Sequence, residues 1–437
     1  MEDMFGSDDS RTRYPTTLEP EPAQQDDGAV RKPVAPQPQP QIEPQAFGGP
    51  LILTVADVDQ LIRRLGADGR TVIGPKVDGP VIGYQPIGGA ADLPSGWGDE
   101  QGPGHYRLRR RDDDALFGYA LAPTSWKRYV FPARSELFRA RREDGALAIT
   151  TIPPARPRYA FIGMRACEIA ALDVQRRVFM RPEAPDPTYA ANTQDMFVVA
   201  VSCGSPAATC FCVSAGTGPE ASGGYDIRLT EVNSTPNSPD HYFVANAGTQ
   251  AGADVLAQLA CKPASDSETG AATQIVQAAA TAIGQGVKLD DVHELLARNR
   301  ENPRWDDVAA RCLSCGNCTM SCPTCFCSDV VDENPIGDDG VVRARVWASC
   351  FGVSYSQMHG GNARTSTSSR YRQWLTHKMS TWVDQFDVSG CVGCGRCITT
   401  CPVGIDIRTE LEAIRATDTA TKYPESVRPQ TDEGLAT

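Results

Sequence analysis

The chain has 437 residues, which is long enough for two or three domains, and its formal net charge is −12. A chain this acidic repels the nucleic-acid backbone, so we expect no nucleic-acid partner. No apolar run approaches the length of a membrane span, and the acidic N-terminus lacks the apolar core of a secretion signal. The 16 cysteines of such a chain therefore predict metal thiolates in the cytoplasm, with no membrane attachment.

The first 46 residues are rich in proline, glutamine and aspartate. Such a segment buries too little apolar surface to offset the entropy lost on ordering. We therefore expect a disordered tail over 1–46.

Periodicity predicts short helices and strands after this tail. The predicted helices lie at 56–65 and near 135–142, and the predicted strands at 71–73, 81–84 and 115–121. A clearer alternation follows, with a buried strand at 159–164, a helix at 167–179 and a second buried strand at 196–202. Strand, helix and strand in this order indicate a βαβ unit with parallel strands, so we expect an α/β domain here.

Four cysteines follow the elements of this unit. Cys167 comes after the first buried strand, Cys203 after the second, and Cys210 and Cys212 lie a few residues further on. Ligand sites in such sheets lie beyond the carboxyl ends of the strands, where these cysteines can meet. Their spacing is unusual and leaves two interpretations open: a third 4Fe–4S cluster, or buried and unreactive thiols.

The remaining elements are mainly helical. We predict paired strands at 225–232 and 241–245, and helices at 249–259, 271–283, 290–296 and 368–386. The last helix carries one strongly apolar face, formed by Tyr371, Trp374, Leu375, Met379, Trp382, Val383 and Phe386.

Two cysteine runs of the form C-x2-C-x2-C-x3-C-P enclose that helix. In a bacterial-type ferredoxin the first three cysteines of each run hold one 4Fe–4S cluster, and the fourth reaches the other cluster. The pattern therefore predicts one cluster on Cys312, Cys315, Cys318 and Cys401, and a second on Cys391, Cys394, Cys397 and Cys322.

Zinc and disulfides are the alternatives to iron–sulfur clusters. Zinc sites usually take two separated C-x2-C pairs rather than three cysteines within seven residues, and disulfides need an oxidising compartment. Four cysteines remain without an assigned role: Cys261, Cys325, Cys327 and Cys350. We interpret Cys261 as a packed thiol and the other three as alternate ligands or, more simply, as thiols that shield a cluster.

The predicted fold class is α+β, with an N-terminal α/β domain and a C-terminal bacterial-type two-cluster ferredoxin domain. The expected boundaries are 1–46 for the tail, 47–262 for the α/β domain, 263–304 for a helical connector, 305–415 for the cluster domain with its helical insertion, and 416–437 for a C-terminal tail.

Several segments together resemble a known family. They are 161–172, 209–219, 312–318, 369–374 and 390–402. In combination they are similar to the β subunits of cytosolic NAD(P)-linked nickel–iron hydrogenases, also called sulfhydrogenases, and to the related iron–sulfur subunit of anaerobic sulfite reductase. The resemblance extends from about residue 48 to about residue 415.

The resemblance implies an electron-transfer subunit of a hetero-oligomer. It would relay electrons between a flavin subunit that handles NAD(P)H and nickel–iron hydrogenase subunits, with no catalytic site of its own. It also favours a third cluster on Cys167, Cys203, Cys210 and Cys212. The alternatives are the electron-transfer subunit of an anaerobic sulfite reductase, and an iron–sulfur sensor or assembly module.

Overall fold

The computed structural model describes residues 47–418, apart from 145, 235–239, 285, 335, 338 and 339. The predicted tail over 1–46 and the residues after 418 lie outside the described part. Among the described residues, no helix combines the length and apolar character needed to cross a bilayer.

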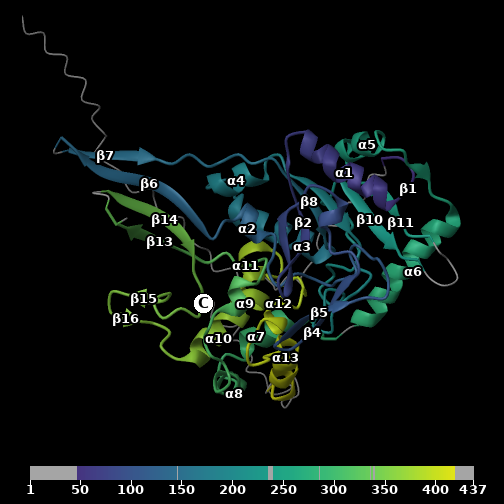
Figure 1. Ribbon diagram of the computed structural model, residues 1–437. Coiled ribbons are helices and arrows are strands. Elements are labelled where there is room, and N and C mark those ends of the chain that lie inside the picture. The colour runs from purple at the N-terminus through teal and green to yellow at the C-terminus, as the bar shows by residue number, and fades with distance from the viewer. Residues whose placement is uncertain are drawn as a thin grey trace, which may run out of the picture. The chain divides into compact units, whose positions relative to one another are not determined.

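An eight-stranded mixed sheet forms the upstream part of the fold (Figure 1). Its strand order is β12-β1-β11-β10-β9-β8-β2-β3. The strands are β1 (Leu51–Leu53), β2 (Thr71–Asp78), β3 (Val81–Pro86), β8 (Tyr159–Met164), β9 (Phe197–Val201), β10 (Ile227–Val232), β11 (Tyr242–Ala247) and β12 (Lys262–Pro263). The four neighbours β2, β8, β9 and β10 run parallel, and the outer pairs are antiparallel. The predicted βαβ unit is confirmed.

Helices cover this sheet because their apolar faces match it. In α1 (Val55–Ala67) a capping box fixes the start, since the Asp57 amide donates to the Thr54 hydroxyl and the Thr54 amide donates to the Asp57 carboxylate. Its apolar positions at helical spacing are Val58, Leu61, Ile62 and Leu65, each at most 2% exposed. The other covering helices are α3 (Ala166–Phe179), α5 (Gln250–Leu256) and α6 (Asp266–Ile283).

A second sheet joins segments that are far apart in the sequence. Its order is β13-β14-β6-β7, with β6 (Arg134–Glu143), β7 (Ala146–Thr151), β13 (Ser328–Glu333) and β14 (Val341–Trp347). The helix predicted near 135–142 is therefore wrong. That segment is a strand because β14 pairs with one of its edges and β7 with the other, and such long-range pairing overrides local propensity.

The strand predicted at 115–121 is also wrong. Its residues are buried but irregular, because side-chain carboxylates satisfy its amides in place of a neighbouring strand. The Leu116 and Phe117 amides donate to the Glu231 carboxylate at 2.6 and 2.9 Å. The Ala120 amide donates to Asp99 at 2.9 Å.

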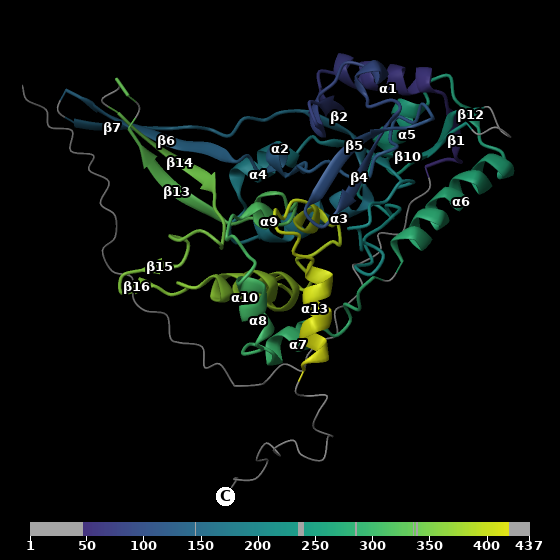
Figure 2. The same ribbon diagram turned by 60° about the horizontal axis from the view of Figure 1, so that its bottom comes forward.

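Four helices lie side by side in the C-terminal part (Figure 2): α7 (Val292–Arg298), α8 (Arg304–Ala309), α10 (Thr367–Thr376) and α13 (Ile407–Ala416). The predicted helix over 368–386 is confirmed as α10, a π-helical turn (His377–Thr381) and α11 (Trp382–Phe386). Two short helices, α9 (Asn317–Met320) and α12 (Arg396–Thr399), each begin inside a cysteine run.

The smaller elements complete the described chain. They are the turn Ala90–Asp92, the helices α2 (Lys127–Val130) and α4 (Pro187–Thr193), and the hairpins β4 (Trp97–Gly102) with β5 (His105–Arg110) and β15 (Gln357–Met358) with β16 (Gly361–Asn362).

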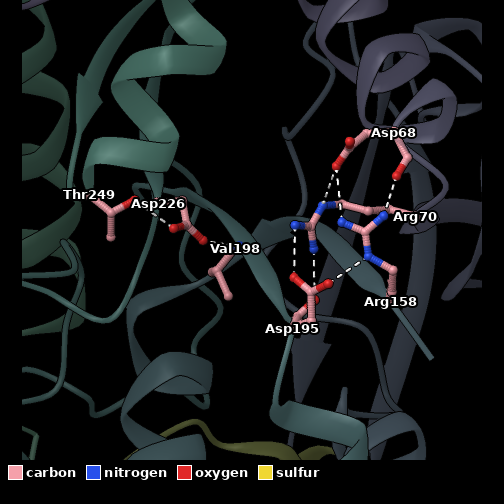
Figure 3. Close-up of polar contacts among 7 residues, drawn as sticks. All are labelled: Asp68, Arg70, Arg158, Asp195, Val198, Asp226 and Thr249. Atoms are coloured by element: carbon pink, nitrogen blue, oxygen red, sulfur yellow. Dashed lines mark hydrogen bonds and ion pairs between the residues drawn. The ribbon is translucent and has the colours of Figure 1, made fainter. Parts of the chain in front are cut away.

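Ion pairs connect the segments that enter the parallel strands (Figure 3). Arg70 precedes β2 and Arg158 precedes β8, and both bind the carboxylate of Asp195, which precedes β9, at 2.9 and 2.6 Å. Both arginines also contact Asp68 at 3.3 Å. These charges pair with one another at the amino ends of the strands, whereas Cys203 follows β9 at the carboxyl end.

Candidate metal centres

Five cysteines from the two C-terminal runs line one pocket. Four of them, Cys312, Cys315, Cys318 and Cys401, are called here the first cysteine group, and the fifth is Cys397. Phe351, Tyr371 and Trp374 provide an apolar wall for the same pocket. Among the described residues, no three His, Cys, Asp or Glu side chains converge closely enough to bind one metal ion. The first group lines this pocket from several sides, as the ligands of a multi-atom core would.

The second cysteine group is Cys391, Cys394, Cys397 and Cys322. Burial raises the pKa of Cys397 well above its ordinary value, and the charges of the other three members raise it further. Burial likewise raises the pKa of Cys391 to about 12, with Cys394 and Cys322 adding to the effect and Lys378 opposing it. The fourth cysteine of each run thus lies near cysteines of the other run.

The third cysteine group is Cys167, Cys203, Cys210 and Cys212, each less than one tenth exposed. Cys167 lies in the first turn of α3, and Cys203 follows β9. Burial raises the pKa of Cys210, as do the charges of Cys203 and Cys212. Burial, then Cys212 and Cys394, raise the pKa of Cys167. The four cysteines are thus neighbours, and Cys167 and Cys212 share one buried cluster with Cys394 of the second group.

Lys378 supplies a test of whether this environment fits an anionic cluster. The side chain is 2% exposed, and its ammonium donates to the Cys322 Sγ at 3.3 Å. Among the described ion pairs it has no carboxylate partner. A buried ammonium is costly unless negative charge lies close to it. The deprotonated ligands of a 4Fe–4S cluster on the second group would supply that charge, so the residues present fit such a cluster.

Arg396 is a second buried cation, and it lies between the second and third cysteine groups. It lies in the sequence between Cys394 and Cys397, is 1% exposed, and forms an ion pair with the buried carboxylate of Glu168. Its Nε donates to the Ala122 carbonyl at 2.9 Å, whereas its buried Nη1 has no hydrogen-bond partner in the described part of the chain. This N–H donor lies among cysteines, so it fits a site whose hydrogen-bond acceptors are sulfur atoms. The other donors to the Glu168 carboxylate are the Tyr84 hydroxyl, the Trp126 indole and the Arg165 amide.

The loops of the second and third groups touch through their backbones. The Phe211 amide donates to the Gly393 carbonyl at 2.9 Å. A Cβ at Gly393 would lie 2.6 Å from the Phe211 carbonyl, and a Cβ at Gly395 would lie 2.4 Å from the Thr209 carbonyl oxygen. Both glycines also have positive φ, of 63° and 74°. Glycine is thus required at both positions for this close approach.

The tetrad Thr-Cys-Phe-Cys occurs twice, at 209–212 and 324–327, and no local pattern in the sequence explains the repeat. In the structure both threonines are fully buried and brace the second cysteine run. Thr209 forms a hydroxyl–hydroxyl hydrogen bond with Thr399 at 2.9 Å. The Thr324 hydroxyl donates to the Gly390 carbonyl at 2.6 Å. The repeat therefore holds the same run from two directions.

The remaining cysteines lie in different surroundings. A hydrogen bond from Cys325 lowers the pKa of Cys322 well below its ordinary value, and Lys378 lowers it further against the effect of burial. Burial, then Cys327, raise the pKa of Cys350 to about 12. Cys261 packs against the core of the eight-stranded sheet, which agrees with its interpretation as a packed thiol.

Buried lysine and arginine are the functional candidates that the sequence did not reveal. Lys378 lies on the predicted amphipathic helix, where a lysine suggests a solvated position. The sequence could have indicated Arg396, because it is a charged residue between two predicted ligands, Cys394 and Cys397.

Comparison with known proteins agrees with these features. Residues 311–405 match the family model of a 4Fe-4S dicluster domain. The chain is also similar to the sulfhydrogenase 2 subunit beta of Pyrococcus furiosus, with 27% identity over 306 residues that cover 69% of this chain and 86% of that protein. These findings confirm the α+β fold class, the C-terminal 4Fe–4S ferredoxin-type domain, and the resemblance to iron–sulfur subunits of the hydrogenase β type.

Proposed function

We propose that this chain, an iron–sulfur electron-transfer subunit of the hydrogenase β type, relays electrons inside a cytoplasmic hetero-oligomer. Its partners would be a flavin subunit that handles NAD(P)H and a nickel–iron hydrogenase module. 4Fe–4S clusters on the three cysteine groups would accept and release single electrons. The observation that carries the proposal is the contiguity of the three groups.

The groups are ordered third, second, first. The charge of Cys394 in the second group contributes to the raised pKa of Cys167, Cys210 and Cys212 in the third. Cys397 of the second group lines the pocket of the first group. The second group thus has neighbours in both other groups, which supports one continuous path rather than separate sites.

The two ends of this path differ in exposure. All members of the third group are buried, whereas Cys315 of the first group is exposed. Two apolar residues that line the pocket of the first group are exposed as well, Leu313 by 63% and Val403 by 38%. We propose that one partner subunit docks over this end, where its own redox centre comes close to the first group.

Hydride chemistry would belong to flavin and nicotinamide on a partner subunit, so we expect no net reaction from this chain alone. What the chain contributes is the fixed order of its thiols and the buried cations beside them. Lys378 and Arg396 supply positive charge next to ligands that are negative when deprotonated.

Anaerobic purification of the tagged chain with its natural partners tests this function. Co-purification of a flavin subunit together with a nickel–iron subunit is the expected result. Siroheme in place of nickel would establish the sulfite reductase alternative. A chain that purifies without redox partners, or binds DNA, would overturn the relay and favour a sensor or assembly module.

A further inference from the structure

Lys378 uses all of its hydrogen-bonding capacity inside the protein. Its ammonium, with three N–H donors, contacts the Cys322 Sγ at 3.3 Å, the Thr324 hydroxyl at 3.0 Å and the Gly390 carbonyl at 3.2 Å. The side chain is 2% exposed. Lys378 therefore holds a fixed position against a member of the second cysteine group.

Its backbone is fixed to the same loop. Lys378 lies in the π-helical turn between α10 and α11, a distortion that is often found at functional sites. Its carbonyl accepts a hydrogen bond of 2.9 Å from the Gly390 amide, just before the second cysteine run. A Cβ at Gly390 would lie 2.8 Å from that carbonyl and 2.4 Å from the Trp382 ring. The helix and the loop are thus in direct contact.

Lys127 is a second buried lysine nearby, but it is held differently. Its ammonium contacts the carbonyls of Thr319 at 3.4 Å and Cys325 at 3.2 Å, and it lies 4.0 Å from the centre of the Trp347 ring. It donates no described hydrogen bond to sulfur. Lys127 therefore provides a matched control, with a similar charge and burial but without the bond to a predicted ligand.

We propose that Lys378 is a positioning residue that raises the reduction potential at the second cysteine group. Reduction adds one electron and hence one negative charge to that site. A cation held beside Cys322 stabilises the reduced state more than the oxidised state, and the low dielectric of a buried site strengthens this effect. The inference rests on the proposed function, because it requires a cluster on the second group.

The test is an EPR-monitored redox titration of the full chain, reconstituted anaerobically and compared with Lys378→Met and Lys378→Arg. The signal of the second group is the one that Cys397→Ser alters. Lys378→Met should lower the ratio of reduced to oxidised cluster at a fixed potential at least tenfold. This corresponds to a reduction potential lower by about 59 mV for one electron. Lys378→Arg should stay near the wild-type potential. Lys127→Met should cause a smaller shift.

An unchanged potential in Lys378→Met with wild-type iron content would overturn the inference and leave the relay intact. If Lys378→Met loses iron, Lys378→Gln replaces it: a lowered potential supports the inference, and a wild-type potential overturns it. A wild-type chain that holds no iron on the second group would instead overturn the relay itself, and the inference with it.

Discussion

The amide of Phe211 donates a hydrogen bond of 2.9 Å to the carbonyl of Gly393. This one contact joins the loop that carries Cys210 and Cys212 to the loop that carries Cys391 and Cys394. It connects the α/β part of the chain to the ferredoxin-type part through their backbones. Together with the hydroxyl–hydroxyl hydrogen bond between Thr209 and Thr399 at 2.9 Å, it holds the loops of the second and third cysteine groups against each other.

Gly393→Ala should therefore weaken the protein. The new Cβ would lie 2.6 Å from the Phe211 carbonyl, and φ at this position is 63°. We expect a loss of about 1–3 kcal/mol and a lower thermal unfolding midpoint. Gly270→Ala in α6 is the control, because a Cβ there meets nothing within 4 Å and should leave the midpoint equal or higher. Equal midpoints for Gly393→Ala and the wild type would refute the close approach.

Loss of the Glu168 carboxylate should be more damaging than loss of an exposed acid. Glu168→Ala leaves Arg396 buried without its counter-charge, which costs about 3–5 kcal/mol. Asp332→Ala removes the exposed pair with Arg343 and should change the stability little, because solvent screens this pair. Chemical denaturation of the two variants measures the difference. Similar losses in both would show that the Glu168 pair is not buried as described.

The proposed exchange of the fourth cysteine between the runs predicts which cluster each cysteine variant should damage. Cys401→Ser should remove about four irons and alter the EPR signal of the first group, whereas Cys322→Ser should alter that of the second. Iron analysis with EPR on each variant decides the point. Damage in Cys401→Ser that is confined to the group of Cys391, Cys394 and Cys397 would show that each run keeps its own fourth cysteine.

Burial of the His377 imidazole should make the protein less stable at low pH. Burial lowers its pKa below the ordinary value of 6.5, with the hydrogen bond to Gln385 opposing and Lys378 adding to the shift. Below pH 6.5 the unfolded chain binds a proton more readily than the folded chain, so stability falls as the pH falls toward the folded pKa. His377→Gln should show a smaller drop in thermal midpoint between pH 7.5 and about pH 5.5 than the wild type. The exposed His359→Gln serves as the control, and a wild-type drop in His377→Gln would contradict this assignment.

The sequence predicted those features whose cause is local. Apolar periodicity predicted the buried strands at 159–164 and 196–202, and the cysteine spacing predicts an exchange of Cys322 and Cys401 between the runs that the variants above test. The segment 135–142 was mispredicted because its partner, β14, lies far away in the chain. The segment 115–121 was mispredicted because its amides bind Glu231 and Asp99 rather than another strand.

The buried cations could not be predicted for a related reason. A lysine in an amphipathic helix normally reaches solvent, and only the π-helical turn and the Gly390 loop place Lys378 against Cys322. The roles of the two Thr-Cys-Phe-Cys tetrads likewise depend on contacts with residues 390–399, which no local pattern encodes.

Iron and acid-labile sulfide quantitation on the anaerobically reconstituted chain tests the three-group relay most directly. Three 4Fe–4S clusters predict about twelve irons and twelve sulfides per chain, falling to about eight in Cys210→Ser with Cys212→Ser. Cys261→Ser, which lies against the sheet core away from the three groups, should keep about twelve. About eight irons in the wild type, unchanged when Cys210 and Cys212 are replaced, would contradict the relay.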